Sequence, residues 1–370
     1  MRICIVASSG VSLINFRGCL IKKLVQRGYE VICISIEPKE EMQEAIERLG
    51  ASYFQVEGSR TGIGVLSGLK MIKAYKRAFQ QFKPDMCYLY MSKPIAFGGW
   101  AACKVKIPHI NILVNGLENA YYRRGIKDWL VRCVMNFFYR KVGRKADNVF
   151  MQNHDDYQYF VSHKICSKDK MCVVGGSGVD MEHFMRKPLP PKPVVLMVAR
   201  LLYSKGIREY LGAISIVKAQ NSNVKFMLVG GCDNNDEAIS KKQLEKYIRD
   251  YDIEYCGYAK DVRPFIGQAS IFVLPSYHEG LPRSILEALS MGRPIITTDA
   301  PGCKETVIDG KNGFIVPVGN TELLAEKVLE LASDSSMRER MAEESYILCK
   351  EIFEVNKVNE FIIKKLERSN

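Results

Sequence analysis

Short runs of apolar residues alternate with longer amphipathic stretches along almost the whole chain. The short runs predict strands, and the amphipathic stretches between them predict helices. This alternation is typical of repeated β-α units that build a parallel sheet. In the first half of the chain the predicted strands are 2–7, 30–35, 52–55, 86–90, 109–114, 148–152 and 171–174, and the predicted helices include 15–27, 40–49 and 66–81.

A proline-rich segment divides this pattern into two halves. Residues 187–193 read KPLPPKP, with four prolines in seven positions, and neither a helix nor the interior of a sheet accepts such a run. After this segment the alternation resumes, with predicted strands at 194–199, 224–229, 271–274, 294–297 and 313–316.

We therefore predict an α/β protein with two Rossmann-like, doubly wound parallel-sheet domains that face a cleft. The expected boundaries are an N-terminal domain over 1–186, a linker over 187–193, a second domain over 194–350 and a C-terminal helix within 351–370. We expect this last helix to pack back on the first domain.

The composition excludes several broad classes of protein. With 370 residues, of which 47% are hydrophobic, the chain is long enough for two cores and is neither disordered nor a disulfide-stapled miniprotein. Its 12 cysteines are scattered without a C-x-x-C pair, which favours a reducing compartment. We expect no signal peptide and no membrane-spanning helix, because the N-terminal apolar run is short and no window of about 18 apolar residues exists.

The net charge of +12 is concentrated in the first half of the chain. Residues 1–190 hold 29 Lys and Arg against 16 Asp and Glu, a balance of +13, whereas residues 191–370 hold 24 against 25, a balance of −1. The first half is therefore expected to face an anionic partner. We find no RNA- or DNA-binding motif, so nucleic acid is not the expected partner.

One segment of the first half combines charge with apolar residues. Residues 121–145 read YYRRGIKDWLVRCVMNFFYRKVGRK, with eight Arg and Lys against a single acid, Asp128. This composition suits an amphipathic helix that lies on an anionic leaflet. An ordinary domain helix with a solvated basic face has the same pattern.

Two loops at the ends of predicted strands could hold an anion. In the first half, strand 2–7 runs into a small-residue turn at Gly10 and then a helix, which suits an anion at the helix start, although a simple tight turn explains it equally. No G-x-G-x-x-G fingerprint is present there. In the second half, Arg200 and Lys205 flank the loop after strand 194–199 and could grip a diphosphate from two sides, or form an ordinary solvated loop.

The next loop in the second half, after strand 224–229, contains glycines that let a ligand approach the backbone, among them Gly231. Asp and Asn residues at 233–236 suit a helix cap better than a metal site.

The strongest pattern is the segment EGLPRSILEA, residues 279–288, which follows strand 271–274. Gly280 frees the backbone and Pro282 fits the first turn of a helix that carries Glu287. Backbone amides at that helix start suit phosphate oxygens, and Glu279 and Glu287 would flank the bound group. An alternative is that one of these glutamates caps the helix and the other is simply exposed. That alternative explains the residue types but not why they occur together with Arg200 and Lys205.

Taken together, these motifs resemble the carboxyl-terminal domain of the retaining glycosyltransferases of family 4, which have the two-domain GT-B fold. The match covers essentially the whole second half. In the first half, SLINFRGCLIKKLVQRGYEV and NILVNGLENA are similar to the bacterial branch that builds lipid-linked oligosaccharides, in particular N-acetylgalactosaminyltransferases that elongate undecaprenyl-diphosphate-linked glycans. The second half carries the resemblance in Arg200, Lys205-Gly206, Glu279 and Glu287 within EGLPRSILEA, Gly292-Arg293-Pro294 and Gly302-Cys303-Lys304-Glu305.

The resemblance implies a nucleotide-sugar donor, most simply a UDP-sugar, in the second domain. Arg200 and Lys205 would bind its diphosphate, Glu287 the ribose and Glu279 the transferred sugar. No metal or other cofactor is then expected, because two cations and a helix start supply fixed positive charge for the departing diphosphate. The remaining candidate residues for donor binding are Gly10, Gly231, Tyr258, Gly280, Leu281, Pro282 and Arg283.

One position departs from the family pattern. Many family members have a His followed by Gly after the fifth strand of the first domain, whereas this chain has Asn115-Gly116, with Glu118 two residues further on. Asn115 still donates and accepts hydrogen bonds, so we assign it a role at the donor sugar, while proton transfer there is in doubt. We expect His109, on the strand itself, to be structural.

The function implied is metal-independent transfer of a sugar, with N-acetylgalactosamine as the first candidate, onto a polyprenyl-diphosphate-linked saccharide. The enzyme would then be cytoplasmic and peripheral on the inner face of the cytoplasmic membrane. A UDP-sugar 2-epimerase on the same scaffold is an alternative, against which the loop of Arg200 and Lys205 argues. A dinucleotide-dependent oxidoreductase is another, against which the missing glycine fingerprint argues.

Overall fold

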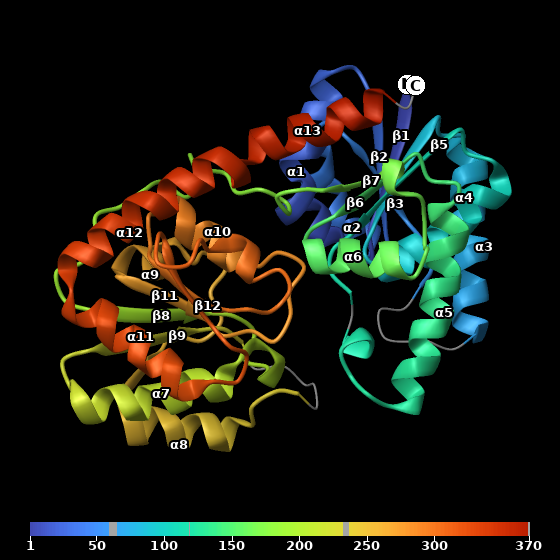
Figure 1. The fold of residues 1–370 in the computed structure, drawn as a ribbon. Helices are drawn as coiled ribbons and strands as arrows, with labels where there is room; N and C mark the ends of the chain where they lie inside the picture. The colour runs from blue at the N-terminus through green and yellow to red at the C-terminus, as the bar shows by residue number, and fades with distance from the viewer. Residues whose placement is uncertain (59–64, 118, 232–236, 369–370) are drawn as a thin grey trace. The chain divides into compact units, whose positions relative to one another are not determined.

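The computed structural model describes residues 1–58, 65–117, 119–231 and 237–368, and divides the chain into two compact units. The first unit comprises Met1–Ser177 together with Asn356–Asn370, and the second comprises Gly178–Val355. Each unit is a parallel sheet covered by helices (Figure 1). The prediction of two doubly wound α/β domains is therefore confirmed.

The described part of the first unit contains a seven-stranded sheet in the order β3-β2-β1-β4-β5-β6-β7. Helices α1, α2 and α13 pack on one face of this sheet, and α3, α4 and α5 pack on the other. The strands are β1 (Arg2–Val6), β2 (Glu30–Ser35), β3 (Ser52–Gln55), β4 (Met86–Tyr90), β5 (His109–Val114), β6 (Asn148–Met151) and β7 (Met171–Val173). The helices are α1 (Gly10–Gln26), α2 (Lys39–Glu47), α3 (Val65–Phe82), α4 (Gly99–Val105), α5 (Ile126–Gly143), α6 (His154–Ser162) and α13 (Val355–Glu367).

The described part of the second unit contains a six-stranded sheet in the order β10-β9-β8-β11-β12-β13. Its strands are β8 (Val194–Val198), β9 (Lys225–Val229), β10 (Ile253–Tyr255), β11 (Ile271–Leu274), β12 (Ile295–Thr298) and β13 (Gly313–Val316). Its helices are α7 (Ile207–Gln220), α8 (Lys241–Tyr251), α9 (Arg263–Gln268), α10 (Arg283–Ser290), α11 (Thr321–Ser333) and α12 (Ser335–Leu348).

Every strand predicted from the apolar runs is present, and its ends agree to within one residue. Strand β10 was missed, because it has only three residues and Glu254 interrupts its apolar pattern. A fully buried strand leaves a continuous apolar run in the sequence, whereas a short edge strand leaves little signal.

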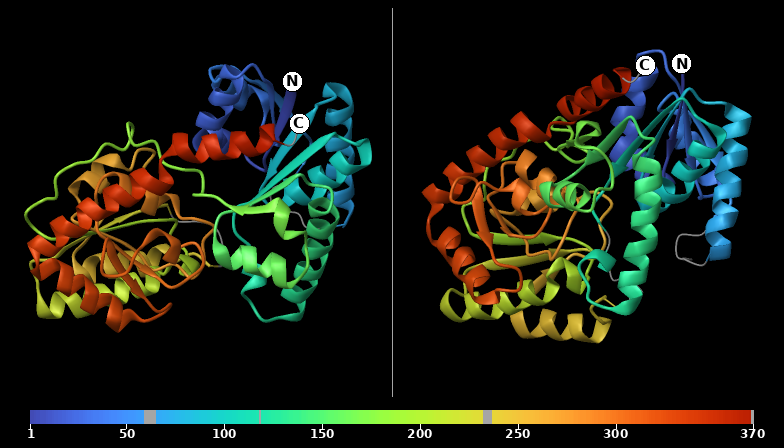
Figure 2. Two further views of the ribbon diagram at one scale, coloured as in Figure 1. Left: turned by 45° about the horizontal axis from the view of Figure 1, so that its top comes forward. Right: turned by 45° about the vertical axis from the view of Figure 1, so that its right-hand side comes forward.

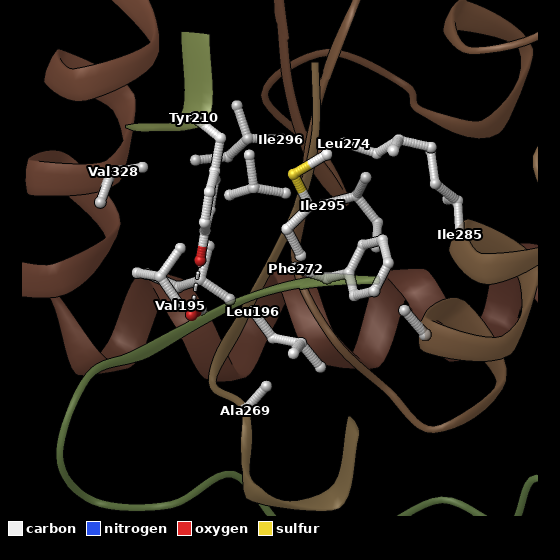
Figure 3. Packing of buried hydrophobic residues seen from close by; sticks show 14 of the residues in the cluster. Val195, Leu196, Tyr210, Ala269, Phe272, Leu274, Ile285, Ile295, Ile296 and Val328 are labelled. Carbon is white, nitrogen blue, oxygen red and sulfur yellow. Dashed lines mark hydrogen bonds between the residues drawn. The ribbon is translucent and has the colours of Figure 1, made fainter. Parts of the chain in front are cut away.

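The core of the second unit shows why the central strands are apolar throughout (Figure 3). Phe272 of β11 and Ile295 of β12 are fully buried between the helices that cover the sheet. Tyr210 of α7 is the polar member of this core, and its hydroxyl lies 3.1 Å from the Val195 carbonyl and 2.8 Å from the Met227 carbonyl. Burial therefore leaves no unpaired phenol in this cluster.

The prediction that residues 187–193 form the linker is wrong. The chain passes between the units at 177–178 and again at 355–356, and the KPLPPKP segment belongs to the second unit. The segment is tied down by Arg293, whose buried guanidinium donates to the carbonyls of Lys187 (2.6 Å), Pro188 (3.3 Å) and Ala269 (2.7 Å). Proline carbonyls still need donors even where no sheet ladder forms, and one arginine supplies them.

The backbone packs closely just after the chain first crosses from one unit to the other, at Gly178 and Val179. The Val179 amide donates to the Phe353 carbonyl (2.8 Å), and the Val355 amide donates to the Val179 carbonyl (3.0 Å). Gly178 has a positive φ of 67°, and a Cβ atom there would lie 2.6 Å from the Val355 Cα atom. Glycine is therefore required where the two chain segments meet.

Helix α13 belongs to the first unit and lies beside α1 (Figures 1 and 2). Glu360 pairs with Lys23 (2.9 Å) and Arg27 (2.6 Å), and Glu367 also pairs with Arg27 (2.8 Å). Its buried side chains, which include Ile362, complete the core beneath α1. The helix that was expected over 351–370 begins at Val355, since Cys349–Phe353 forms a π-helical turn of the second unit.

Replacing Arg293 by Met should lower the free energy of unfolding by about 2 to 4 kcal/mol, because three carbonyls lose a charged donor in the interior. Chemical denaturation followed by circular dichroism measures this change. Arg263→Met is the matched control, because Arg263 pairs with Asp261 on the surface and should contribute about 0 to 1 kcal/mol. Equal effects of the two substitutions would contradict the anchoring role of Arg293.

Candidate functional site

A pocket of about 280 Å³ lies at the carboxyl ends of β8, β9 and β11 in the second unit. The strand order reverses between β8 and β11, and ligands bind at such switch points in open α/β sheets. The pocket brings together seven of the residues that the sequence assigned to a site: Arg200, Lys205, Gly231, Tyr258, Glu279, Pro282 and Arg283.

Lys205 and Glu279 form an ion pair on the wall of this pocket. The Lys205 Nζ atom lies 2.6 Å from the Glu279 Oε1 atom, and the two side chains are only 15% and 17% exposed. The Ser276 hydroxyl lies 3.1 Å from the same Glu279 oxygen. An ammonium held this way has further donors for a second anion, and the low local dielectric strengthens each contact.

Two glycines bring the loops of this pair close together. Gly206 follows Lys205 with a φ of 73°, and a Cβ atom there would lie 2.0 Å from the Pro275 carbonyl oxygen. Gly302 has a φ of 80°, and its Cβ atom would lie 2.4 Å from the Glu279 carbonyl oxygen. Both positions need glycine, which explains why the two glycines occur in the sequence motifs.

Glu287 does not line the pocket. It lies one turn along α10, where its Oε1 atom accepts from the Arg283 Nε atom at 3.0 Å. Burial raises the pKa of Glu287, and the Arg283 guanidinium opposes that rise. Glu287 therefore reaches the pocket wall through Arg283. The predicted residues Gly280 and Leu281 are likewise absent from the wall.

The start of α10 lies on the pocket wall at Arg283 and Ser284. Pro282 is the residue just before the helix rather than a member of its first turn, and the first turn holds no acidic side chain. Amides at such a position attract an anion.

Sequence reasoning missed most of the pocket floor, which consists of strand ends. These residues are Val198, Ala199, Val229 and Leu274, and the signal that could have found them is their place at the end of each strand. Gly230, one of the glycines expected to let a ligand approach the backbone, also belongs to the pocket floor. Gly230 stands out, because a Cβ atom there would lie 1.8 Å from the Ala199 carbonyl oxygen. Its neighbour Gly231 has ordinary space, with the Tyr258 Cβ atom 3.6 Å away.

The described residues contain no group of three His, Cys, Asp or Glu side chains placed to hold a metal ion. The Asp and Asn residues at 233–236 lie outside the described residues. A D-x-D sequence is a usual way of presenting two carboxylates to a nucleotide-bound divalent ion, and Asp250-Tyr251-Asp252 has this form. It lies at the end of α8, however, where Asp252 pairs with Lys218 at 3.5 Å.

Asn115 belongs to a different pocket, in the first unit. This pocket of about 300 Å³ lies at the carboxyl ends of β1, β4 and β5, where the strand order of the first sheet reverses. The Asn115 Oδ1 atom accepts from the Met91 amide at 3.1 Å, and Met91 has a positive φ of 71°. The polar part of the lining comprises Ser8, Ser92, Lys93 and Asn115. Glu118 lies outside the described residues.

The expectation that the Gly10 amide binds a ligand anion is corrected by the structure. This amide donates to the Glu37 Oε2 atom at 2.7 Å, and the Ser35 hydroxyl holds the same oxygen at 2.8 Å. The anion at this helix start is therefore a carboxylate of the chain itself. Sequence reasoning missed it because Glu37 comes from the end of a different strand. His109 lies at the amino end of β5, 3.4 Å from Asp147.

Helix α5 within the basic segment carries a second apolar face, in addition to the one that packs on the core of the first unit through Tyr139 and Val142. Its outward face is apolar and exposed, with Ile126 83% and Trp129 55% exposed, and Leu130, Val134 and Phe137 on the same side. Its inward face is partly polar, since the buried Asn136 donates to the Tyr159 hydroxyl (2.9 Å) and accepts from the Tyr121 hydroxyl (3.1 Å). Figure 2 shows α5 on the outside of the first unit. A helix that only covers a core would expose polar side chains on its outward face.

No described helix combines the length and the apolar composition that crossing a membrane requires.

Comparisons with known proteins match both halves of the chain. Residues 180–347 match the family described as Glycosyl transferases group 1, and residues 2–153 match the one described as Glycosyl transferase 4-like. A curated relative from Campylobacter jejuni, N,N'-diacetylbacillosaminyl-diphospho-undecaprenol alpha-1,3-N-acetylgalactosaminyltransferase, is 31% identical over 92% of each chain. The capsular polysaccharide biosynthesis glycosyltransferase CapM of Staphylococcus aureus is 27% identical over 48% of this chain and 50% of its own.

Solved structures show the same fold. The crystal structure of Anabaena HepE in complex with UDP covers 100% of both chains with a TM-score of 0.78 and 18% identity. Sucrose-phosphate synthase from Thermosynechococcus elongatus covers 100% of this chain and 98% of its own, with a TM-score of 0.81 and 16% identity.

The two glycines of the pocket floor provide a matched pair of substitutions. Gly230→Ala should lower the free energy of unfolding by about 1 to 3 kcal/mol, because the new methyl group overlaps the Ala199 carbonyl. Gly231→Ala should change it by no more than about 0.5 kcal/mol, since its new Cβ atom meets only an ordinary contact. Urea denaturation of both variants measures the difference, and equal effects would contradict the close approach of β8 and β9.

Proposed function

The chain belongs to the glycosyltransferases with group 1 and 4-like domains, a family of retaining enzymes with the GT-B fold, and on that premise we propose its reaction. The enzyme transfers a sugar from a UDP-sugar, with N-acetylgalactosamine as the first candidate, in α linkage to a polyprenyl-diphosphate-linked saccharide. It needs no metal ion. The observation that carries this proposal is the Lys205–Glu279 pair at the switch point of the second sheet, beside Arg200.

The donor diphosphate lies between Arg200, Lys205 and the start of α10. Negative charge grows on the diphosphate as it leaves the sugar, and fixed cations and helix amides stabilise that charge without reorganisation. This arrangement supplies the positive charge that a divalent ion supplies elsewhere.

Glu279 binds hydroxyl groups of the transferred sugar and holds Lys205 in place, since one of its oxygens already accepts from the ammonium. Glu287 does not line the pocket, so we assign it a role on the ribose side that is exerted through Arg283, which it orients and which forms the pocket wall. A carboxylate that accepts two hydroxyl groups of one ring selects for their geometry.

The bond between the anomeric carbon and the diphosphate oxygen breaks while the acceptor oxygen forms its bond to that carbon on the same face. The acceptor proton passes to the departing phosphate oxygen. Configuration is retained and no enzymic nucleophile is required.

The acceptor binds to the first unit. Asn115, which the sequence assigned to the donor sugar, lines this pocket of the first unit and does not line the pocket of the second, so we propose that it contacts the acceptor instead. The pocket at Asn115 offers hydroxyl, amide and ammonium groups of the kinds that bind saccharides and phosphates. Support for a lipid-linked acceptor comes from the Campylobacter relative, whose name specifies an undecaprenol-linked substrate.

The anionic membrane surface binds α5. The exposed apolar side chains enter the interface, and the neighbouring cations of the basic segment approach lipid phosphates. A lipid-linked acceptor then requires a cytoplasmic enzyme that is peripheral on the inner face of the cytoplasmic membrane.

Lys205→Met should reduce sugar transfer about 100- to 1,000-fold, as loss of one transition-state cation does in comparable sites. Transfer of labelled sugar to a lipid-linked acceptor measures this rate. Lys218→Met is the matched control, because Lys218 pairs with the exposed Asp252 in the same unit and does not line the pocket. Circular dichroism establishes that both variants are folded, and a Lys205→Met enzyme with wild-type rates would refute the site.

A panel of UDP, UDP-N-acetylgalactosamine, GDP, ADP and NAD, with and without EDTA, tests the donor by thermal shift. We expect a rise in melting temperature for the uridine compounds alone, unchanged by EDTA and lost in Lys205→Met. A shift with NAD alone would favour an oxidoreductase, and turnover without acceptor would favour an epimerase.

Replacing Ile126, Leu130 and Phe137 of α5 together by Ser should weaken binding to phosphatidylglycerol vesicles at least about 100-fold, because each buried apolar side chain contributes about 1.5 to 3 kcal/mol. Sedimentation with the vesicles measures binding, and turnover of a short-chain soluble acceptor should not change. Leu69→Ser is the control, since Leu69 is an exposed leucine (57%) of α3 outside this face. Undiminished vesicle binding by the triple variant would exclude α5 as the docking surface.

A further inference from the structure

Asp156 is a buried carboxylate to which the proposed reaction gives no role. It lies in the first turn of α6 and is 1% exposed. Its Oδ2 atom accepts from the Leu117 amide at 3.1 Å, and Leu117 lies two residues after Asn115. The carboxylate therefore holds the backbone of the loop that follows β5, next to the pocket of the first unit.

The same carboxylate also contacts the beginning of the basic segment. Its Oδ1 atom accepts from the Tyr122 hydroxyl at 3.3 Å. The backbone near Tyr122 is tied to α5, because Arg132 donates to the carbonyls of Ala120 (2.6 Å) and Arg123 (2.7 Å). Asp156 thus connects the residues after Asn115 with the residues that lead into α5.

Capping of α6 does not account for this carboxylate. Asn153 already caps the helix, since its Oδ1 atom accepts from the Asp156 amide at 2.8 Å. Asp155 places a second carboxylate in the first turn, where it interacts favourably with the helix dipole. The Asn153 Nδ2 atom donates to Asp156 Oδ2 at 3.0 Å, so the cap orients the carboxylate toward the loop.

Burying this charge is unfavourable. Burial raises the pKa of Asp156 to about 6, against the opposing effect of its donors Asn153, Leu117 and Tyr122. If Asp156 served packing alone, an apolar residue could take its place without loss of stability, because burying the carboxylate costs desolvation energy.

We propose that Asp156 is a positioning residue for the acceptor side of the enzyme. It fixes the backbone after Asn115, at Leu117, relative to Tyr122, which precedes α5. The lipid part of the acceptor at α5 and its saccharide part at the Asn115 pocket can then bind at the same time. This inference rests on the proposed function of both surfaces.

Asp156→Leu removes both acceptor oxygens and keeps a side chain with the same branching, whereas Asp156→Asn keeps one oxygen for the Leu117 amide and turns its NH₂ group toward the Tyr122 oxygen. Tyr122→Phe removes the hydroxyl that donates to Asp156 Oδ1 and leaves the Leu117 amide its acceptor. Asp147→Asn is the matched control, because Asp147 accepts from the Ile110 amide (3.0 Å) at the opposite end of β5.

Hydrogen exchange of the peptide covering residues 115–122 gives a readout that requires no turnover. We expect exchange at least about tenfold faster in Asp156→Leu, corresponding to one lost hydrogen bond, and near wild-type exchange in Asp156→Asn and in the Asp147→Asn control. Unchanged exchange in Asp156→Leu would overturn the inference. If that variant does not fold, faster exchange in Tyr122→Phe supports the inference, and wild-type exchange overturns it.

Steady-state kinetics then separate positioning from a general loss of structure. For Asp156→Leu and Tyr122→Phe we expect KM for the lipid-linked acceptor to rise at least about tenfold. The thermal shift with UDP should be unchanged, because the donor pocket lies in the other unit. Equal losses toward donor and acceptor, or no rescue by Asp156→Asn, would overturn the positioning role. If the proposed function itself were wrong, the result would be different, because the unsubstituted enzyme would show neither sugar transfer nor a thermal shift with UDP.

Discussion

The reversal of strand order in each sheet is the constraint on which the rest of the structure depends. In both units the chain adds strands on one side of its first strand and then returns to the other side, between β1 and β4 and between β8 and β11. The connections leave these neighbouring strands in opposite directions, so the carboxyl ends stay uncovered. Each of the two pockets lies at such a point. The positions of the candidate sites thus follow from topology.

Within the second unit, close backbone contacts convert this opening into a specific site. Gly206, Gly230 and Gly302 allow approaches to neighbouring carbonyls that no Cβ atom would permit. As a result Lys205 and Glu279 meet in a largely buried pair. Burying such a pair costs desolvation energy, but the pair is rigid. A cation held rigidly can stabilise negative charge that develops during a reaction without first having to reorganise.

The first unit combines two surfaces of different character. Helix α5 has an exposed apolar face, and the lining of the pocket at Asn115 includes the polar residues Ser8, Ser92, Lys93 and Asn115. Asp156 and Arg132 connect the chain between them by hydrogen bonds. A lipid-linked saccharide, the proposed acceptor, has the same two parts, an apolar chain and a polar head.

The sequence by itself determined the strands, the two-domain class and seven of the residues that line the pocket of the second unit, because buried parallel strands are continuously apolar and loops after them follow in chain order. Only the tertiary structure decided matters that depend on distant partners. The Glu37 carboxylate accepts the hydrogen bond of the Gly10 amide. Arg293 anchors the proline-rich segment from which the sequence had predicted a linker. Glu287 lies behind Arg283, and Asp156 reaches Leu117 across 39 positions of the chain. Sequence patterns report local periodicity, whereas hydrogen-bond partners far apart in the chain are set by packing.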